Sequence, residues 1–132
     1  MSDEAGFAGH RVLVVEDDAI IAIYLERLVE SLGGTVAATV GRVDQALAVI
    51  EQDEPDAAIL DVNLGRGRDS YPVARALAER HVPFLFVTGY GREGVREDFR
   101  DHPVLDKPVR EWELARTLGM LCAARAQAAV SA

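Results

Sequence analysis

The chain has little of several features that would place it in a specialised class. It has one cysteine, Cys122, so it cannot form an internal disulfide. No apolar run approaches the roughly 18–20 residues of a membrane span, and residues 1–10 lack the apolar core of a signal peptide. Basic residues are also scarce: 14 Lys and Arg stand against 22 Asp and Glu, which disfavours nucleic acid as a partner. We therefore expect a cytoplasmic protein that contacts neither membranes nor nucleic acids.

The features that are present describe one globular domain. The chain has 132 residues, of which 49% are hydrophobic and 27% charged, enough to build a proper core. We expect residues 1–10 to form a flexible arm, residues 11–125 the folded domain, and residues 126–132 a frayed, alanine-rich tail. No repeat or low-complexity linker indicates a second domain. The start at Met1 and the loose tail favour a complete protein.

Short apolar strand patterns alternate with helical patterns along the chain. Strands are predicted over residues 11–16, 35–40, 56–61, 83–88 and 104–106. Helices are predicted over residues 19–32, 43–54, 71–80 and 109–125, with a short and weak one over 93–99. No two strands are joined by a hairpin-length turn. This order predicts a parallel sheet with helices on both faces and right-handed crossovers.

Polar side chains follow four of the five predicted strands, at the end where each strand finishes. They are Glu16 and Asp17, Asp61, Thr88 and Lys107. In an open parallel sheet these ends lie side by side, and ligands bind there. Crowded carboxylates repel one another unless a cation shares the site, and Mg²⁺ prefers such oxygen ligands. A metal, an ammonium and a hydroxyl around one carboxylate suit a phosphoryl group, with Asp61 as its nucleophile.

Each of these residues also has a purely structural interpretation. Asp17 or Asp18 could cap the first helix, and Thr88 could simply end a strand beside a turn. Lys107 could be a surface lysine followed by Pro108 at the first position of a helix. Their joint placement at the ends of four strands favours the functional interpretation.

The ordered motifs VVEDD, ILDVNL, VTG and LDKP resemble the receiver domain of bacterial two-component response regulators. The resemblance covers about residues 11–120, nearly the whole chain. It implies a flavodoxin-like fold with three α/β/α layers, in which the five-stranded parallel sheet has the order 2-1-3-4-5.

The resemblance also assigns a role to each matching residue. Asp61 is expected to be the phosphoacceptor and a ligand of Mg²⁺. Asp17 would bind the metal directly, Glu16 through metal-bound water, and Asn63 through its backbone carbonyl.

Three further residues complete the assignment by resemblance. The Thr88 hydroxyl would follow the phosphoryl group, and the Lys107 ammonium would pair with it. The Lys107–Pro108 peptide bond is expected to be cis.

The chain departs from the usual receiver pattern at three positions. Val104 stands where most receivers carry the Tyr or Phe that moves with the threonine. Tyr90 instead follows Thr88 by two residues, in a segment that resembles the "FAT GUY" motif of alphaproteobacterial single-domain receivers, with Val87 where that motif has alanine. We hypothesise that Tyr90 takes over the switching role; the alternative is that it packs on the short fourth helix. Val109 replaces a common Phe, which we expect to alter packing only.

The function implied is that of a stand-alone response regulator rather than an enzyme. It would accept a phosphoryl group from a sensor histidine kinase or a histidine phosphotransfer protein, then pass it on, bind a partner or act as a phosphate sink. Phosphorylation could also bring two copies together as a homodimer. Residues 18–22 border the acceptor and are the expected kinase-docking face, with Ile20 and Ala22 either exposed contacts or buried.

Two other functions compete with this interpretation. A small Mg²⁺-dependent phosphohydrolase would need an acid two residues after its nucleophile, where this chain has Asn63. It would also need a substrate-covering cap, for which the predicted elements leave no residues over. A phosphorylation-independent pseudo-receiver would not need to keep Glu16, Asp17, Asp61, Thr88 and Lys107. Both are therefore minor alternatives.

Overall fold

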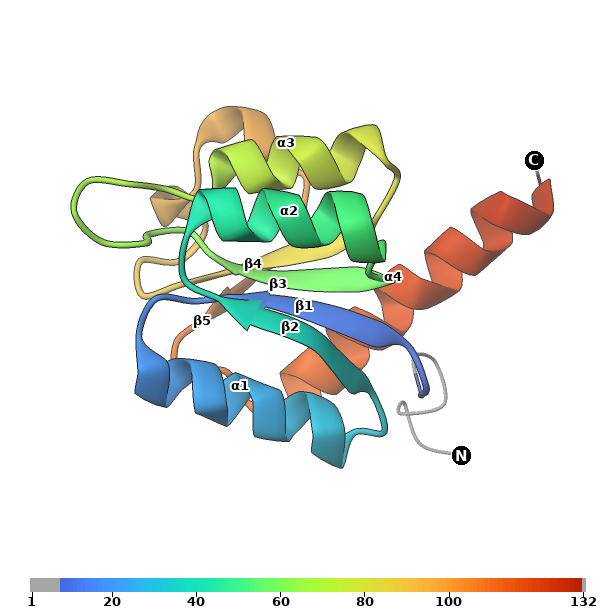
Figure 1. Cartoon of the computed structure of the whole chain (residues 1–132). Helices are drawn as coiled ribbons and strands as arrows, with labels where there is room; N and C mark the ends of the chain where they lie inside the picture. The colour runs from blue at the N-terminus through green and yellow to red at the C-terminus, as the bar shows by residue number, and fades with distance from the viewer. Residues whose placement is uncertain (1–7, 132) are drawn as a thin grey trace.

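Five parallel strands form one sheet in the order β2-β1-β3-β4-β5, which confirms the predicted fold class and strand order (Figure 1). The computed structural model describes residues 8–131, and side chains up to residue 126. The strands are β1 (Arg11–Val15), β2 (Thr35–Val40), β3 (Ala57–Asp61), β4 (Phe84–Thr88) and β5 (Val104–Asp106). Strands β3 and β4 are buried throughout, as expected for the centre of a sheet that is covered on both faces.

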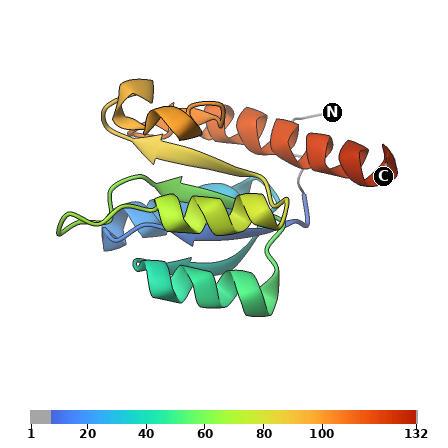
Figure 2. The ribbon, with the colours of Figure 1, turned by 90° about the horizontal axis from the view of Figure 1, so that it is seen from above.

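Four α-helices cover the two faces of the sheet. They are α1 (Ala19–Ser31), α2 (Val43–Asp53), α3 (Tyr71–Glu79) and α4 (Glu111–Ser131). Helices α1 and α4 lie on one face, and α2 and α3 on the other (Figures 1 and 2). Helix α4 includes residues 126–131, for which we expected a frayed tail, whereas residues 1–7 of the expected arm lie outside the described residues.

Alternating strand residues supply a separate core to each face, because successive side chains of a strand point to opposite sides. Leu13 and Val15 of β1 pack in the cluster beneath α2 and α3. Val12 and Val14 pack in the cluster beneath α1 and α4.

The start of α1 is fixed by a side-chain cap. The Asp18 carboxylate accepts hydrogen bonds from the backbone N–H groups of Ile20 and Ile21, at 2.9 and 3.2 Å. This confirms Asp18 as the helix cap and leaves the Asp17 carboxylate free for another role. Of the two candidate contacts on this helix, Ile20 is 80% exposed, but Ala22 is buried. Of the two alternatives left open for Ala22, the buried one holds, since it continues the inner stripe of the helix.

The prediction of a short helix over residues 93–99 is wrong. The segment instead forms two single turns of 3₁₀ helix, η2 (Arg92–Gly94) and η3 (Glu97–Phe99). Val95 between them is extended and buried, and the Phe99 ring stacks on Tyr71 with centroids 5.0 Å apart. The segment is too short to form a stable α-helix by itself, so the contacts of Val95 and Phe99 with the core decide its conformation.

Among the described residues, none of the helices combines the length and the apolar character needed to cross a membrane.

Candidate functional site

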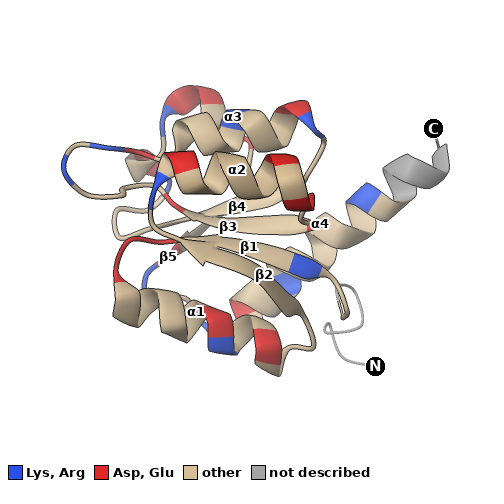
Figure 3. Ribbon diagram, in the orientation of Figure 1, with Lys and Arg blue, Asp and Glu red and all other residues tan. Residues whose placement is uncertain are grey.

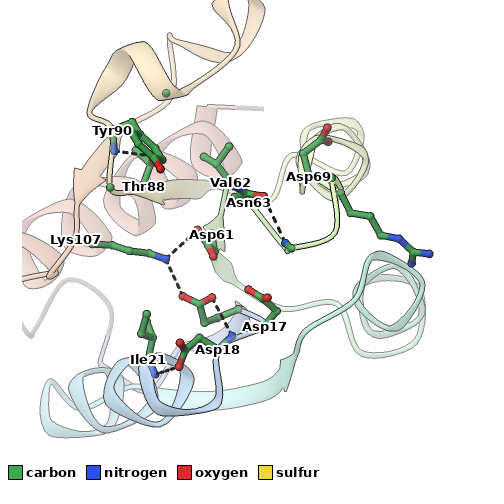
Figure 4. A pocket seen from close by; sticks show the side chains of 16 residues that line it. Asp17, Asp18, Ile21, Asp61, Val62, Asn63, Asp69, Thr88, Tyr90 and Lys107 are labelled. Carbon is green, nitrogen blue, oxygen red and sulfur yellow. Dashed lines mark hydrogen bonds and ion pairs between the residues drawn. The ribbon is translucent and has the colours of Figure 1, made fainter.

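The carboxyl ends of β1, β3, β4 and β5 open into one pocket of about 660 Å³ (Figure 4). Each predicted site residue except Pro108 lines this pocket: Glu16, Asp17, Asp61, Asn63, Thr88, Tyr90 and Lys107. The parallel topology explains this convergence, because residues that follow different strands reach the same edge of the sheet.

Three carboxylates form an acidic cluster in the pocket. Glu16 and Asp61 are 3% and 4% exposed, whereas Asp17 is exposed. One oxygen of each acid lies within 4.8 Å of an oxygen of the others. The Glu16 Oε1 atom is fully buried and accepts no hydrogen bond; its one charged contact is the Lys107 ammonium at 3.3 Å. Such an unsatisfied buried oxygen is costly unless a further ligand completes the site.

Lys107 is the basic residue that meets this cluster. Its Nζ atom lies 3.2 Å from Asp61 Oδ1 and 3.3 Å from Glu16 Oε1 (Figure 4). Burial lowers the pKa of Lys107, but the negative charges of Asp61 and Glu16 outweigh it, so the net shift is upward. The ammonium therefore stays charged at neutral pH and holds the two buried carboxylates together.

One lysine does not balance three acids. Burial, reinforced by the neighbouring Asp61 carboxylate, raises the pKa of Glu16 to about 8. A cation that joined the cluster would favour the ionised form of Glu16 and relieve this repulsion.

The donor set fits a hard divalent ion such as Mg²⁺. It offers three carboxylates with oxygens in reach of one another, including the unsatisfied Glu16 Oε1. Gly65 keeps the site open: a Cβ atom there would lie only 2.9 Å from Asp17 Oδ2. Asn63 lines the same pocket, and its side-chain Oδ1 accepts a hydrogen bond from the Gly65 N–H at 3.4 Å.

Thr88 is the last residue of β4. It lies on the opposite side of Asp61 from Asp17, the exposed acid of the cluster (Figure 4). Its side chain is buried, and its Oγ1 accepts a hydrogen bond from the Tyr90 N–H at 3.1 Å. The Thr88 carbonyl accepts a second bond from the Lys107 N–H at 3.0 Å, which fixes β5 beside β4. The hydroxyl is therefore engaged with the loop that follows it.

Two further features of the predicted set concern Tyr90 and Pro108. The Tyr90 side chain is 78% exposed. The Lys107–Pro108 peptide bond is cis in the structure.

Two glycines of the pocket were missed by reasoning from the sequence. Gly65 approaches Asp17, and a Cβ atom on Gly94 would lie 2.9 Å from Thr88 Oγ1. Both belong to glycine-rich loops, VNLGRG and GYGREG, but the pattern alone does not show which glycine makes a close approach.

The sequence model of the response regulator receiver domain matches residues 12–118. The chain belongs to this family. Its members act in two-component signalling, and the acidic pocket lies where receiver domains bind Mg²⁺.

Individual relatives agree with this assignment. The solution structure of SdrG from Sphingomonas melonis Fr1 is 45% identical, with a TM-score of 0.77 over 92% of this chain and 98% of SdrG. A structure of SdrG from Pseudomonas melonis Fr1 in its BeF3-activated conformation is 47% identical, with a TM-score of 0.74 over 86% of this chain and 98% of that one.

A curated relative is longer than this chain. The transcriptional regulatory protein PdtaR of Mycobacterium tuberculosis is 29% identical over 106 residues, which are 80% of this chain. The match spans 51% of PdtaR, so this receiver corresponds to about half the length of that relative.

Proposed function

We propose that this receiver domain accepts a phosphoryl group on Asp61 from a phosphohistidine of a sensor histidine kinase or a histidine phosphotransfer protein. The observation that carries the proposal is the Asp61 carboxylate itself, 4% exposed and paired with Lys107 at 3.2 Å in a pocket with excess acid. Such an arrangement disfavours a merely structural role, because a buried pair beside two further acids is poorly compensated.

The chemistry follows from the residues around Asp61. One Asp61 oxygen attacks phosphorus, the new O–P bond forms, and the N–P bond to the donor imidazole breaks. The Lys107 ammonium neutralises charge on the transferred oxygens, and Thr88 can donate its hydroxyl hydrogen to one of them. Glu16, Asp17, Asp61 and the Asn63 carbonyl would hold Mg²⁺, which supplies further neutralisation of the phosphoryl oxygens when bound.

We infer that the segment after Thr88 reports the phosphoryl group to partners. Thr88 Oγ1 accepts a hydrogen bond from the Tyr90 N–H, and we propose that the Thr88 side chain rotates away from it to donate to a phosphoryl oxygen on Asp61. Movement of the hydroxyl therefore disturbs Tyr90, whose exposed ring would act as the switch aromatic that Val104 cannot supply. The BeF3-activated conformation known for SdrG supports testing this with the same phosphoryl mimic.

The first turn of α1 is the proposed docking surface for the phosphodonor. Ile20 is 80% exposed and stands between Asp18 and Ile21, which line the pocket, and Ile23 and Tyr24 are 49% and 43% exposed on the same helix. Apolar side chains left in contact with water beside a reactive group are typical of a protein contact. Ile20→Glu should therefore slow transfer from a kinase while leaving phosphorylation by a small donor unchanged.

Once Asp61 is phosphorylated, the signal must leave the domain. We propose that it leaves by phosphotransfer or by contact with another protein, including a second copy of this chain, in the cytoplasm. The domain would become phosphorylated and would then return to its free form by hydrolysis of its own phosphoryl group, rather than acting as an enzyme on a separate substrate.

The test is intact-mass measurement after incubation with Mg²⁺ and acetyl phosphate, on wild type and Asp61→Ala. We expect one phosphoryl adduct on wild type and none on Asp61→Ala. An adduct of equal size on Asp61→Ala would refute Asp61 as acceptor. No adduct on wild type, together with no Mg²⁺ binding by calorimetry, would instead favour a pseudo-receiver that works without phosphorylation.

A further inference from the structure

Gly94 lies against the hydroxyl of Thr88. A Cβ atom built on Gly94 would be 2.9 Å from Thr88 Oγ1 and 2.8 Å from Tyr90 Cβ. Both distances are shorter than real Cβ contacts, so a side chain at this position conflicts with the arrangement of Thr88 and Tyr90. Gly94 does not have a positive φ, so the backbone conformation itself does not require glycine. The requirement comes from the close approach alone.

The turn that brings Gly94 to Thr88 begins at Gly91. Gly91 has φ +65°, and its carbonyl accepts a hydrogen bond from the Gly94 N–H at 3.0 Å. The Val95 N–H bonds in turn to the Arg92 carbonyl at 3.0 Å. This single turn folds residues 91–94 back over the end of β4.

The chain beyond Gly94 is held firmly in place. Val95 is 1% exposed, and its carbonyl accepts a hydrogen bond from Arg100 Nε at 2.8 Å. The Arg96 N–H donates to the Tyr71 hydroxyl at 2.7 Å, and the Arg96 guanidinium lies over the Tyr71 ring. The Phe99 ring stacks on Tyr71 and meets Phe86 edge to face. Residues 95–100 are therefore anchored to the core, whereas residues 89–94 have one side-chain tie to that segment, the hydrogen bond that Arg92 Nη2 donates to the Arg100 carbonyl at 2.8 Å.

We propose that Gly94 is a positioning residue: its missing side chain leaves the space in which Thr88 keeps its hydroxyl on the Tyr90 N–H. This inference rests on the proposed function, in which the same hydroxyl also serves a phosphoryl oxygen on Asp61. That proposal includes a rotation of the Thr88 side chain toward Asp61, in which its hydroxyl leaves the Tyr90 N–H, so whatever destabilises the Tyr90-bound arrangement favours the phosphoryl-bound one. Filling the space with a methyl group penalises the first arrangement and thereby primes the domain.

The experiment compares two alanine substitutions in one loop. Gly94→Ala places a Cβ atom against Thr88 and Tyr90, whereas a Cβ atom on Gly89 would meet nothing within 4 Å. Neither glycine has a positive φ, so Gly89→Ala controls for the loss of backbone freedom next to Thr88. The probe is fluoroberyllate with Mg²⁺, titrated calorimetrically into each folded variant.

We expect Gly94→Ala to bind fluoroberyllate about threefold to tenfold more tightly than wild type, as a modest overpacking penalty on the free state requires. Gly89→Ala should stay within about twofold of wild type. In the free protein, the Tyr90 amide resonance of Gly94→Ala should move toward its position in fluoroberyllate-bound wild type. A merely structural role for Gly94 would not produce this directed shift.

Equal or weaker binding by Gly94→Ala, with wild type binding normally, would overturn this inference alone. Absence of binding in wild type and Gly89→Ala would overturn the proposed function and the inference with it. Should Gly94→Ala fail to fold, hydrogen exchange of wild type decides the matter. The Tyr90 amide should be protected in the free protein and exchange faster when fluoroberyllate is bound; equal protection in both states would refute this rotation.

Discussion

Strands β1 and β3 carry a charged cluster at each of their two ends, and the two clusters differ in balance and burial. The amino-end cluster contains two bases and two acids: Arg11, Asp53, Asp56 and Arg125. Its charged side chains are 36–44% exposed. Arg11 Nη2 lies 2.6 Å from Asp53 Oδ2, and the Arg11 N–H donates to Asp56 Oδ2 at 2.8 Å.

The carboxyl-end cluster contains three acids and one base: Glu16, Asp17, Asp61 and Lys107. Glu16 and Asp61 are buried, and Glu16 Oε1 is ion-paired with Lys107 but accepts no hydrogen bond. Figure 3 shows the same contrast along the chain, with basic ribbon at the start of β1 and acidic ribbon in the turn that follows it.

The comparison separates a cluster that completes the fold from one that awaits a ligand. The amino-end cluster pairs its charges in contact with water, where an ion pair contributes little and needs nothing more. The carboxyl-end cluster holds unbalanced charge away from water, which is stable only with an added cation or a bound proton. Function is therefore expected at one end of the strands alone.

The largest expected difference is in phosphorylation rate. Lys107→Gln removes the cation beside Asp61 and should lower the initial rate with acetyl phosphate about 100-fold, as loss of one charge-stabilising donor does. Arg125→Gln, in the amino-end cluster, should leave the rate unchanged. The measurement is a time course of the phosphorylated fraction by intact mass. A similar loss in both variants would erase the distinction between the two clusters.

The next difference is in the response to Mg²⁺. Mg²⁺ at about 100 times its dissociation constant should raise the free energy of unfolding of wild type by about 3 kcal/mol. Asp17→Asn should lose this gain, since it removes a ligand, and Asp53→Asn should keep it. Urea unfolding with and without Mg²⁺ measures the effect. Retention of the full gain in Asp17→Asn would place the ion elsewhere.

The two clusters should also respond to pH with opposite sign in the absence of metal. The pKa of Glu16 is raised from 4.5 to about 8 by burial and by Asp61, so the folded protein binds a proton that the unfolded chain releases. Its contribution to stability is present below pH 4.5 and is lost as pH rises toward about 8. The Arg11 guanidinium lowers the pKa of Asp53, so that contribution is present above 3.8 and is lost as pH falls.

Urea unfolding of wild type, Glu16→Gln and Asp53→Asn, at pH values from below 3.8 to above 8, measures both contributions. Glu16→Gln should flatten the alkaline side of the stability profile, and Asp53→Asn the acidic side. The contrast fails if Glu16→Gln leaves the alkaline side unchanged.

The smallest effect is expected at the amino end. Arg11→Gln breaks an exposed ion pair and should leave the free energy of unfolding almost unchanged, because water replaces the lost partner. Urea unfolding at neutral pH measures it. A large loss of stability would mean that the amino-end cluster, too, is more than a surface pairing.

Much of the fold and of this site could be predicted from the sequence. The alternation of short apolar runs with helical patterns predicted the parallel sheet, and the Asp after Glu16-Asp17 proved to be the cap of α1. These features are local, because strand burial, helix periodicity and capping depend on residues close together in the chain. The parallel topology then carries Asp61 and Lys107, far apart in sequence, to the same edge.

Other features were decided only by the tertiary structure. Residues 93–99 have a weak helical pattern, but Tyr71 binds Phe99 and the Arg96 amide from another part of the chain, and the segment follows those contacts instead. The approach of Gly94 to Thr88 likewise depends on where that loop folds back. The sequence by itself determined which residues reach the carboxyl edge of the sheet. Only tertiary packing decided how closely they meet, because distances between side chains of separate elements are set by the packed core rather than by local pattern.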